Sequence, residues 1–335
     1  MPCKPTLARP GTRDEYSACV SKELVADDAY DFLLFSLPDN DHHSHRWGPD
    51  ATPVSIAHAD RCFGELVEAC GGMDQFLDTH SVILVADHAQ TRVEHPLALA
   101  ESLADEWRVV DPNTPADGAD LAVSPISRAA GIYVLADGAR AARVQDGVLE
   151  RLRRLDGVDL FAWLSNGDGT PVHRPESGPP ACGEVVVERQ GSTLRFRPGR
   201  GVVDRRGRGW EVDGDLDALL ARVDDGRIES EDYPDALSRL WSALRAPHAG
   251  DILVSAAAGF ELVDWGGVTH CPGGSHGSLH AGDSLGPLLL CGLEPGIAAS
   301  REQWALRDVA RLVLDHFDVG GGSDPMPERD ASMRA

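Results

Sequence analysis

The sequence lacks features that would mark several common classes of protein. No apolar stretch is long enough to cross a membrane, and no apolar signal core follows Met1. No basic stripe runs along the chain: the short clusters at 151–154 and 205–208 lie among acids, and the formal net charge is -23. We therefore expect no membrane span and no nucleic-acid groove. An anionic substrate would need local cations in its site to overcome this acidic field.

The cysteines also lack a recognisable pattern. There are seven, an odd number, and no two are spaced as Cys-x-x-Cys. This predicts no disulfide framework and favours a reducing compartment. We therefore predict a cytoplasmic location, with the reservation that a missing N-terminal part could have carried an export signal. Cys62 and Cys70 fall on one predicted helix and are interpreted as core residues, and Cys271 as a buried thiol rather than a ligand.

What the sequence does contain indicates an α/β fold. Its 335 residues are 42% hydrophobic and 25% charged, which fits a globular protein. Apolar runs at 31–37 and 81–86 predict buried strands joined by a helix at 53–70, which is the order of a right-handed parallel crossover. We expect a mostly parallel central sheet with flanking helices. Short alternating segments within 184–212, separated by Gly-rich turns, predict a small antiparallel meander.

The remaining predicted elements follow the same rules of periodicity. Helices are predicted at 97–105, 138–155, 215–223, 234–245 and 301–317, and strands at 107–110, 120–123, 131–135, 161–164, 251–255, 260–264 and 286–291. The last two strand regions enclose a Gly- and His-rich loop, and the strands at 251–255 and 260–264 are expected to form a pair.

Polar and charged motifs at both ends of the chain divide it into regions. We predict an α/β core formed by residues 1–110 and 251–318, interrupted by a cap-like α+β insertion at 111–250 that contains the meander. Residues 319–335, rich in Gly, Ser and Pro, are predicted to be a disordered tail.

The most informative stretch is 38–50, which contains Asp41 and His45. It follows the apolar run at 31–37, so we expect these side chains at the carboxyl edge of a sheet, where ligands bind in α/β folds. Asp87 and His88 follow the second apolar run in the same way. His276 lies among small residues, which would let backbone approach a crowded site. Carboxylate and imidazole groups are ligands of divalent cations, so we predict a metal site at this edge.

These motifs occur in a definite order: Asp41-x-x-x-His45-x-x-Gly48-Pro49, then Ala86-Asp87-His88, then Ser275-His276-Gly277. In this order they resemble the motifs of the alkaline phosphatase superfamily, and most closely those of its type I phosphodiesterase and nucleotide pyrophosphatase branch. The resemblance covers residues 30–95 and 250–292. One departure is Ala89, which stands where the family usually has Gly.

The resemblance implies which residues hold metal. Asp41, His45 and His276 would bind one ion, and Asp87 and His88 would help to bind a second. Two zinc ions are expected, with manganese as an alternative. Asp39 and His43 are also four residues apart, but we favour Asp41 because His45 has the family's distance to Gly48-Pro49. His42 and His43 are interpreted as lying around the site or in solvent, and His270 and His280 as loop residues without a ligand role.

The resemblance also implies a function. We expect a metal-dependent phosphoric ester hydrolase acting on a small phosphodiester or nucleotide-like substrate by in-line attack on phosphorus. The family's nucleophile, a Thr or Ser that opens a helix, is expected upstream of this chain, since Thr12 and Ser17 do not follow that arrangement. The sequence thus resembles the family with an N-terminal part missing. The alternatives are an inactive or non-catalytic metal-binding remnant and a phosphomutase, and no oligomeric state is predicted.

Overall fold

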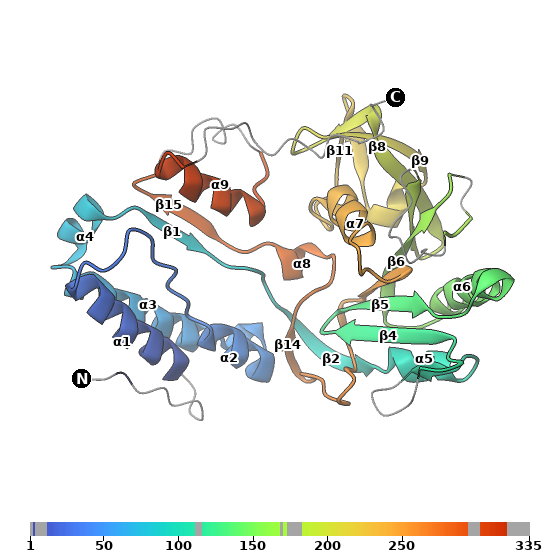
Figure 1. The fold of residues 1–335 in the computed structure, drawn as a ribbon, viewed down its shortest axis with the longest axis horizontal. Coiled ribbons are helices and arrows are strands. Elements are labelled where there is room, and N and C mark those ends of the chain that lie inside the picture. Colours follow the sequence, from blue (N-terminus) through green and yellow to red (C-terminus); the bar gives the residue numbers. More distant parts are fainter. Residues whose placement is uncertain are drawn as a thin grey trace.

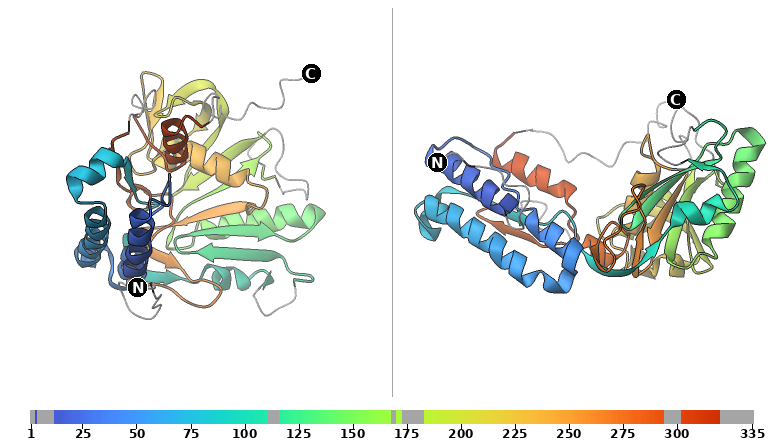
Figure 2. Two further views of the ribbon diagram at one scale, coloured as in Figure 1. Left: turned by 60° about the vertical axis from the view of Figure 1, so that its left-hand side comes forward. Right: turned by 90° about the horizontal axis from the view of Figure 1, so that it is seen from below.

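The computed structural model describes residues 3, 12–110, 116–167, 170–172, 183–293 and 302–319. Figure 1 shows two parts side by side. One consists of helices around a two-stranded sheet, and the other is built on a large sheet. A three-stranded sheet lies where the two parts meet (Figures 1 and 2).

The helical part encloses a pair of short strands. β1 (Val82–Val85) pairs antiparallel with β15 (Leu288–Cys291). Figure 1 shows α1–α3 on one side of this pair and α9 on the other. The helices are α1 (Thr12–Ala26), α2 (Asp39–Trp47), α3 (Pro53–Ala69), α4 (Met73–Thr79) and α9 (Arg307–His316), with a 3-10 turn at Pro49–Ala51.

The predicted strand at 31–37 is wrong. These residues are described and belong to no strand, and Phe32 and Leu34 are 58% and 79% exposed. A strand needs a neighbouring strand to hydrogen-bond its backbone groups. The run at 31–37 was expected to lie in one sheet with β1, but among the described residues β1 pairs with β15. The predicted parallel crossover is therefore also wrong. The polar stretch that follows forms helix α2 rather than a loop at a sheet edge.

The second part is built on the large sheet, whose strand order is β10-β11-β8-β7-β6-β12-β5-β4-β3 with β9 paired to β8. The strands are β3 (Val109–Val110), β4 (Leu121–Ile126), β5 (Ala129–Val134), β6 (Val158–Ser165), β7 (Glu184–Arg189), β8 (Ser192–Asp204), β9 (Gly209–Gly214), β10 (Arg222–Asp224), β11 (Arg227–Glu229) and β12 (Ile252–Ala256). The helices of this part are α5 (Leu99–Ala104), α6 (Gly138–Leu152) and α7 (Ala236–Leu244), with a 3-10 helix at Leu216–Leu219. The meander β7–β9 is antiparallel, as predicted.

The core lies on both faces of this sheet, and β6 shows why. Phe161 and Trp163 pack in the cluster that includes Val148 of α6. The alternate residues Leu160, Ala162 and Leu164 pack in the cluster that includes Leu240 of α7. Side chains of successive strand residues point to opposite faces. A strand buried on both faces therefore reads as a continuous apolar run, as the sequence at 160–164 does.

The predicted α/β class, with a multi-stranded sheet and flanking helices, is confirmed. The direction of the strands differs from expectation, because most pairs in the large sheet are antiparallel. β12 lies between β5 and β6, although the sequence analysis placed it in the core outside the insertion. The domain division stays a prediction. Of the predicted tail at 319–335, all but residue 319 lies outside the described residues.

The connecting sheet has the order β13-β2-β14, formed by β2 (Thr91–Leu97), β13 (Gly259–Leu262) and β14 (Gly273–Ser275). The predicted pairing of 251–255 with 260–264 is wrong, because β13 runs parallel to β2 while β12 belongs to the large sheet. The short helix α8 (Ala281–Ser284) follows β14. The chain thus crosses between the two parts through segments that carry Asp87, His88 and His276.

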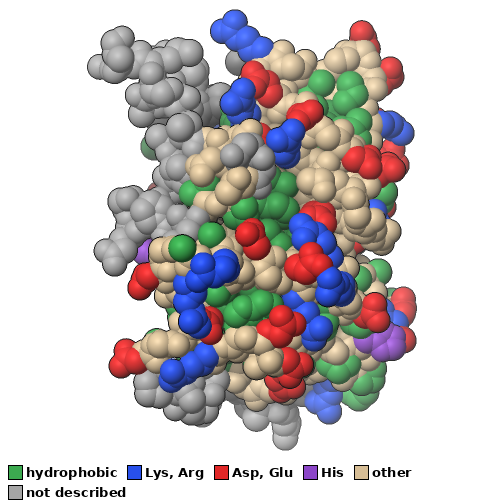
Figure 3. Space-filling model, turned by 90° about the vertical axis from the view of Figure 1, so that its right-hand side faces the viewer, with side chains coloured by type: hydrophobic (Ala, Val, Ile, Leu, Met, Phe, Trp, Pro, Cys, Tyr) green, Lys and Arg blue, Asp and Glu red, His purple; other side chains and the backbone are tan. Residues whose placement is uncertain are grey.

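Charges of both signs are intermixed on the surface of the large-sheet part (Figure 3). Across β8 and β9, Arg195 pairs with Asp213, and Arg197 pairs with Glu211 at 2.6 Å. These two cationic side chains of β8 are thus matched by carboxylates of β9. In the described part of the chain, no helix combines the length and the apolar character that a membrane span requires.

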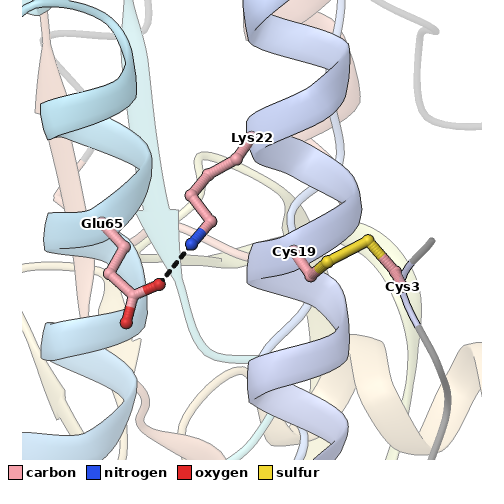
Figure 4. Close-up of a disulfide and its surroundings, with 4 residues drawn as sticks. All are labelled: Cys3, Cys19, Lys22 and Glu65. Atoms are coloured by element: carbon pink, nitrogen blue, oxygen red, sulfur yellow. Dashed lines mark hydrogen bonds and ion pairs between the residues drawn. A yellow bond between two sulfur atoms is a disulfide. The ribbon is translucent and has the colours of Figure 1, made fainter. Parts of the chain in front are cut away.

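A disulfide joins Cys3 to Cys19 of α1, with their Cα atoms 5.9 Å apart (Figure 4). The expectation of a chain without disulfides is therefore wrong. Cysteine spacing does not reveal which thiols the fold brings together. Disulfides are typical of oxidising compartments, so this bond argues against the reducing compartment inferred from the cysteine pattern. The cytoplasmic location stays a prediction.

We expect Cys19→Ser to lower the free energy of unfolding by about 3 kcal/mol, because closing a loop of this length restricts the unfolded chain. Cys291→Ser, at an exposed free thiol, is the matched control and should leave stability unchanged. Urea denaturation without reductant measures both. Equal stability of the two variants would mean that the bond does not form in solution.

Candidate metal centre

Helix α2 begins at a reciprocal contact with α1. Asp39 Oδ2 accepts hydrogen bonds from the backbone N–H groups of Arg13 and Asp14, at 3.0 and 2.9 Å. Asp14 Oδ1 in turn accepts one from the N–H of Asp39 at 3.0 Å. The first N–H groups of a helix have no partner within it, so each carboxylate satisfies orphan donors of the other helix. This contact fixes where α2 starts, two residues before Asp41.

Glycines fix the other end and the inner side of α2. Gly48 ends the helix at φ 86°, a conformation that favours glycine. A Cβ on Gly273 would lie 2.1 Å from the carbonyl oxygen of His45, and one on Gly274 would lie 2.5 Å from that of Ser44. Only glycine allows β14 to approach α2 this closely. Figure 1 shows the two elements adjacent.

Three imidazoles from separate segments face the carboxylate of Asp41. Its Oδ1 lies 3.4 Å from Nε2 of His45, one helical turn further along α2. The same oxygen lies 3.7 Å from Nε2 of His88, which follows β1, and 4.0 Å from Nε2 of His276, which follows β14. The rings of His88 and His276 stack with centroids 3.6 Å apart. Four of the five predicted ligands thus meet at one point.

Backbone carbonyls set the orientation of two of these rings. Nδ1 of His45 donates to the oxygen of Gly274 at 2.8 Å, and Nδ1 of His88 donates to that of Ala89 at 3.1 Å. A carbonyl oxygen only accepts, so Nδ1 carries the hydrogen in each ring. In the neutral imidazole the lone pair is then on Nε2, the atom that faces Asp41. This is how outer partners prepare histidine to bind a metal.

Asp87 takes a different position from the other four. Its side chain is 78% exposed, against 46% for Asp41 and 25% for His88. Its Oδ1 lies 3.7 Å from Nε2 of His88. Asp87 is therefore open to solvent at the rim of this cluster, next to the predicted ligand His88.

Gln90 is a site residue that the sequence analysis missed. Its Nε2 donates to Oδ1 of Asp41 at 2.5 Å and to the backbone oxygen of the same residue at 3.3 Å. Its position directly after Asp87, His88 and Ala89 was the available signal. Gln90 Oε1 and Ser44 Oγ are buried without hydrogen-bond partners. Both would lie 2.8 Å from a Cβ on Gly274.

The electrostatics of the site keep Asp41 ionised. Burial alone would raise its pKa, but the hydrogen bond with His45 and the charges of the three histidines outweigh it and lower the pKa. Burial would lower the pKa of His45, yet the hydrogen bond with Asp41 raises it. The pKa of His276 is lowered, first by burial and then by the charges of His88 and His45. Asp41 and His276 therefore tend toward the forms that bind metal.

A buried carboxylate supports the back of the site. Glu261 is 1% exposed, and its Oε1 accepts hydrogen bonds from Nδ1 of His270 at 2.7 Å and Oγ of Ser275 at 2.6 Å. The ring of His270 stacks on that of His45, with centroids 3.9 Å apart. His270 thus packs against a central ring, although no role was predicted for it.

The other Asp, His and Cys residues that the sequence analysis considered, but did not choose as metal ligands, do not face Asp41 and have other surroundings. Asp39 is used at the helix start described above, and Nε2 of His43 contacts the oxygen of Ala51 at 3.1 Å. His42 is exposed. Nδ1 of His280 accepts from the N–H of Gly282 at 3.0 Å. Sγ of Cys271 lies 3.9 Å from Glu261.

The donor set fits one small divalent cation. Among the described residues, ligand atoms of Asp41, His88 and His276 all lie within 4.8 Å of one another. A tetrahedral zinc with ligands about 2.0–2.1 Å away holds them about 3.4 Å apart. The observed 3.7 and 4.0 Å separations from Asp41 require only small side-chain movements. Two imidazoles and a carboxylate are typical zinc ligands.

The comparisons with known proteins agree with the sequence motifs. A family model described as type I phosphodiesterase / nucleotide pyrophosphatase matches residues 7–279, so the chain belongs to this family. The predicted resemblance is thereby confirmed, and the chain is a member of a family of phosphoester hydrolases. No curated protein sequence matches the chain.

One solved structure similar to this chain is phosphonoacetate hydrolase from Sinorhizobium meliloti 1021 in complex with phosphonoformate. The identity is 14% and the TM-score 0.43, and the match covers 86% of this chain and 52% of that chain. This chain therefore spans about half the length of that hydrolase.

We expect Gly274→Ala to destabilise the protein by about 1–3 kcal/mol, because the added methyl group forces α2 and β14 apart. Gly64→Ala on α3, where a Cβ meets nothing within 4 Å, is the control. That change should be neutral or stabilising, since alanine favours helix. Thermal unfolding of both variants is the measurement, and a Gly274→Ala variant as stable as the control would refute the close approach.

Proposed function

We propose that this chain binds divalent cations through Asp41, His45, Asp87, His88 and His276 and serves in hydrolysis of a phosphoric ester. The convergence of three segments far apart in sequence on Oδ1 of Asp41, in a member of a phosphodiesterase family, is the observation that carries the proposal. Solvated surface residues have no reason to gather three imidazoles around one carboxylate.

The metal assignment keeps the two-ion arrangement inferred from the motifs. Asp41, His45 and His276 hold one ion, and Asp87 with His88 contributes to the second. Zinc is the first choice because imidazole predominates, and manganese is the alternative. The compact group of Asp41, His88 and His276 supports binding of at least one ion.

The chain's own residues have separable tasks. Bound cations would stabilise the equatorial and leaving oxygens of a transferring phosphoryl group. Asp41 offsets the charge of the cations, and Gln90 holds its carboxylate in place. The ring N–H groups of His45 and His88 are occupied by backbone carbonyls, which leaves Nε2 directed at the centre. Asp87 at the solvent-facing rim is placed where a substrate would enter.

The substrate class follows from charge as well as from family. With a net charge of -23, the molecule repels phosphate esters at long range, and only the bound cations would attract them. A small phosphodiester with one negative charge is less strongly repelled than a phosphomonoester. Charge therefore favours a phosphodiester over a phosphomonoester, while a nucleotide-like substrate is proposed from the family alone.

We expect Asp41→Ala and His88→Ala each to lower zinc affinity by more than about 100-fold. Removing a residue that only hydrogen-bonds a metal ligand typically lowers affinity by about 10- to 100-fold, and removing the ligand itself should cost more. Each variant removes a donor atom from the centre. His42→Ala is the matched control, because His42 is exposed on the same helix beside Asp41. Competition with a chromogenic chelator measures affinity, and bis-p-nitrophenyl phosphate measures turnover.

The two readouts separate the candidate functions. Zinc binding with turnover that is lost in Asp41→Ala supports the hydrolase. Zinc binding without turnover, both by this chain and by a form that also carries the Thr or Ser nucleophile implied by the family resemblance, supports the alternative of a non-catalytic metal-binding protein. Wild-type protein that takes up neither zinc nor manganese contradicts both.

A further inference from the structure

A buried ion pair lies between the segments that carry His88 and His276. The side chains of Arg128 and Asp283 are 2% and 0% exposed, and Nη1 of Arg128 lies 2.6 Å from Oδ1 of Asp283. Arg128 is in the turn between β4 and β5, and Asp283 is on α8. A buried ion pair is weak evidence of stability, because the desolvation of both charges offsets their attraction. Its location therefore calls for another explanation.

The pair is hydrogen-bonded to both ligand-bearing segments. The N–H of Arg128 donates to the oxygen of His276 at 3.0 Å, and the N–H of Ala89, next to His88, donates to the backbone oxygen of Asp283 at 2.9 Å. Oδ2 of Asp283 accepts from the N–H of Ser278 at 2.9 Å. The first two bonds are made by the backbone of Arg128 and Asp283, and the third by the Asp283 carboxylate. The ion pair therefore joins two residues whose backbones contact the segments that carry the two histidines.

The same pair holds the start of β2, which follows Gln90. Oγ1 of Thr91 donates to Oδ1 of Asp283 at 2.7 Å and also contacts Nη1 of Arg128. The turn that contains His88 is therefore held at two points, Ala89 and Thr91. Gln90 lies between them and reaches Asp41 from this fixed turn.

The guanidinium of Arg128 is bound on every side. Nε donates to the oxygen of Phe260 at 3.0 Å, and Nη2 donates to those of Ala256 and Ala257 at 3.4 and 2.9 Å. Only arginine presents its donors in such a rigid planar fork. Through these hydrogen bonds Arg128 is anchored to the link between β12 and β13. The segments that carry His88 and His276 are in turn bonded to Arg128 and Asp283.

We propose that Arg128 and Asp283 are positioning residues that hold the rings of His88 and His276 at their observed distances from Oδ1 of Asp41, so that ligands of both cations are in place together. The proposal rests on the proposed function in that it takes these residues as metal ligands. Neither Arg128 nor Asp283 contacts the cation. Their effect is to make the site rigid before the metal arrives, which increases affinity.

The first test is zinc affinity of the double variant Arg128→Met/Asp283→Asn. Removing both charges avoids leaving one buried and unpaired. The matched control is Arg206→Met/Asp308→Asn, which removes another buried pair, with side chains 10% and 7% exposed, between the β8–β9 turn and α9. We expect the first variant to lose at least about tenfold in zinc affinity and the control to stay within about twofold. Equal affinities in the two variants would overturn the proposal.

The second test needs no metal. In metal-free protein, hydrogen exchange at the amides of Ala89, Arg128 and Ser278 should be faster in the double variant than in wild type or control. Unchanged exchange at these amides overturns the positioning role. If wild-type protein takes up neither zinc nor manganese, the proposed function fails, and this exchange experiment alone decides whether the ion pair orders these segments.

A single substitution keeps the proposal testable if the double variant does not fold. Arg128→Lys retains the charge but cannot form the planar set of hydrogen bonds. We expect it to lose more zinc affinity than Arg206→Lys does. Equal losses in the two lysine variants would contradict the positioning role.

Discussion

The approach of three imidazoles to Oδ1 of Asp41 is the interaction on which the site depends. Each histidine comes from a different segment, and each is oriented by something other than Asp41 itself. His45 and His88 donate to carbonyl oxygens, and the backbone of His276 is held by Arg128. The carboxylate thus lies in a frame that the surrounding backbone has already fixed. A frame of this kind lowers the cost of ordering ligands when a cation binds.

The rest of the fold explains how that frame forms. The large sheet is buried on both faces and supplies the turn that carries Arg128. The connecting sheet places β14 against α2, with glycines where the backbones meet. Helix α2 is fixed at its start by the exchange of hydrogen bonds between Asp14 and Asp39. The predicted ligands therefore lie at a junction of the two parts rather than at the edge of one sheet.

Much of this was predictable from local pattern. The helix at 53–70 and the strand at 161–164 have clear apolar periodicity, and both form. The candidate site residues were predicted from the order and spacing of short motifs. That prediction does not depend on a correct assignment of the helices and strands around the motifs. The motif at 38–50 was assigned to a loop after a strand, yet it forms a helix, and a four-residue step brings Asp41 and His45 together on a helix as well. Gln90, Arg128, Asp283 and Glu261 were missed. Their roles depend largely on contacts between distant parts of the chain, up to 192 residues apart for Thr91 and Asp283, and no local pattern encodes such contacts.

The apolar run at 31–37 and the pair β1–β15 leave strand-like sequence in contact with water. Leu34 is 79% exposed and Leu289 62%. Among the described residues no further strand pairs with β1 or β15, and open strand edges invite pairing between molecules. A net charge of -23 opposes such encounters, because like charges repel before edges can meet. That protection weakens as salt shortens the range of the repulsion. Raising the ionic strength therefore weakens a repulsion that opposes contact between copies of this chain.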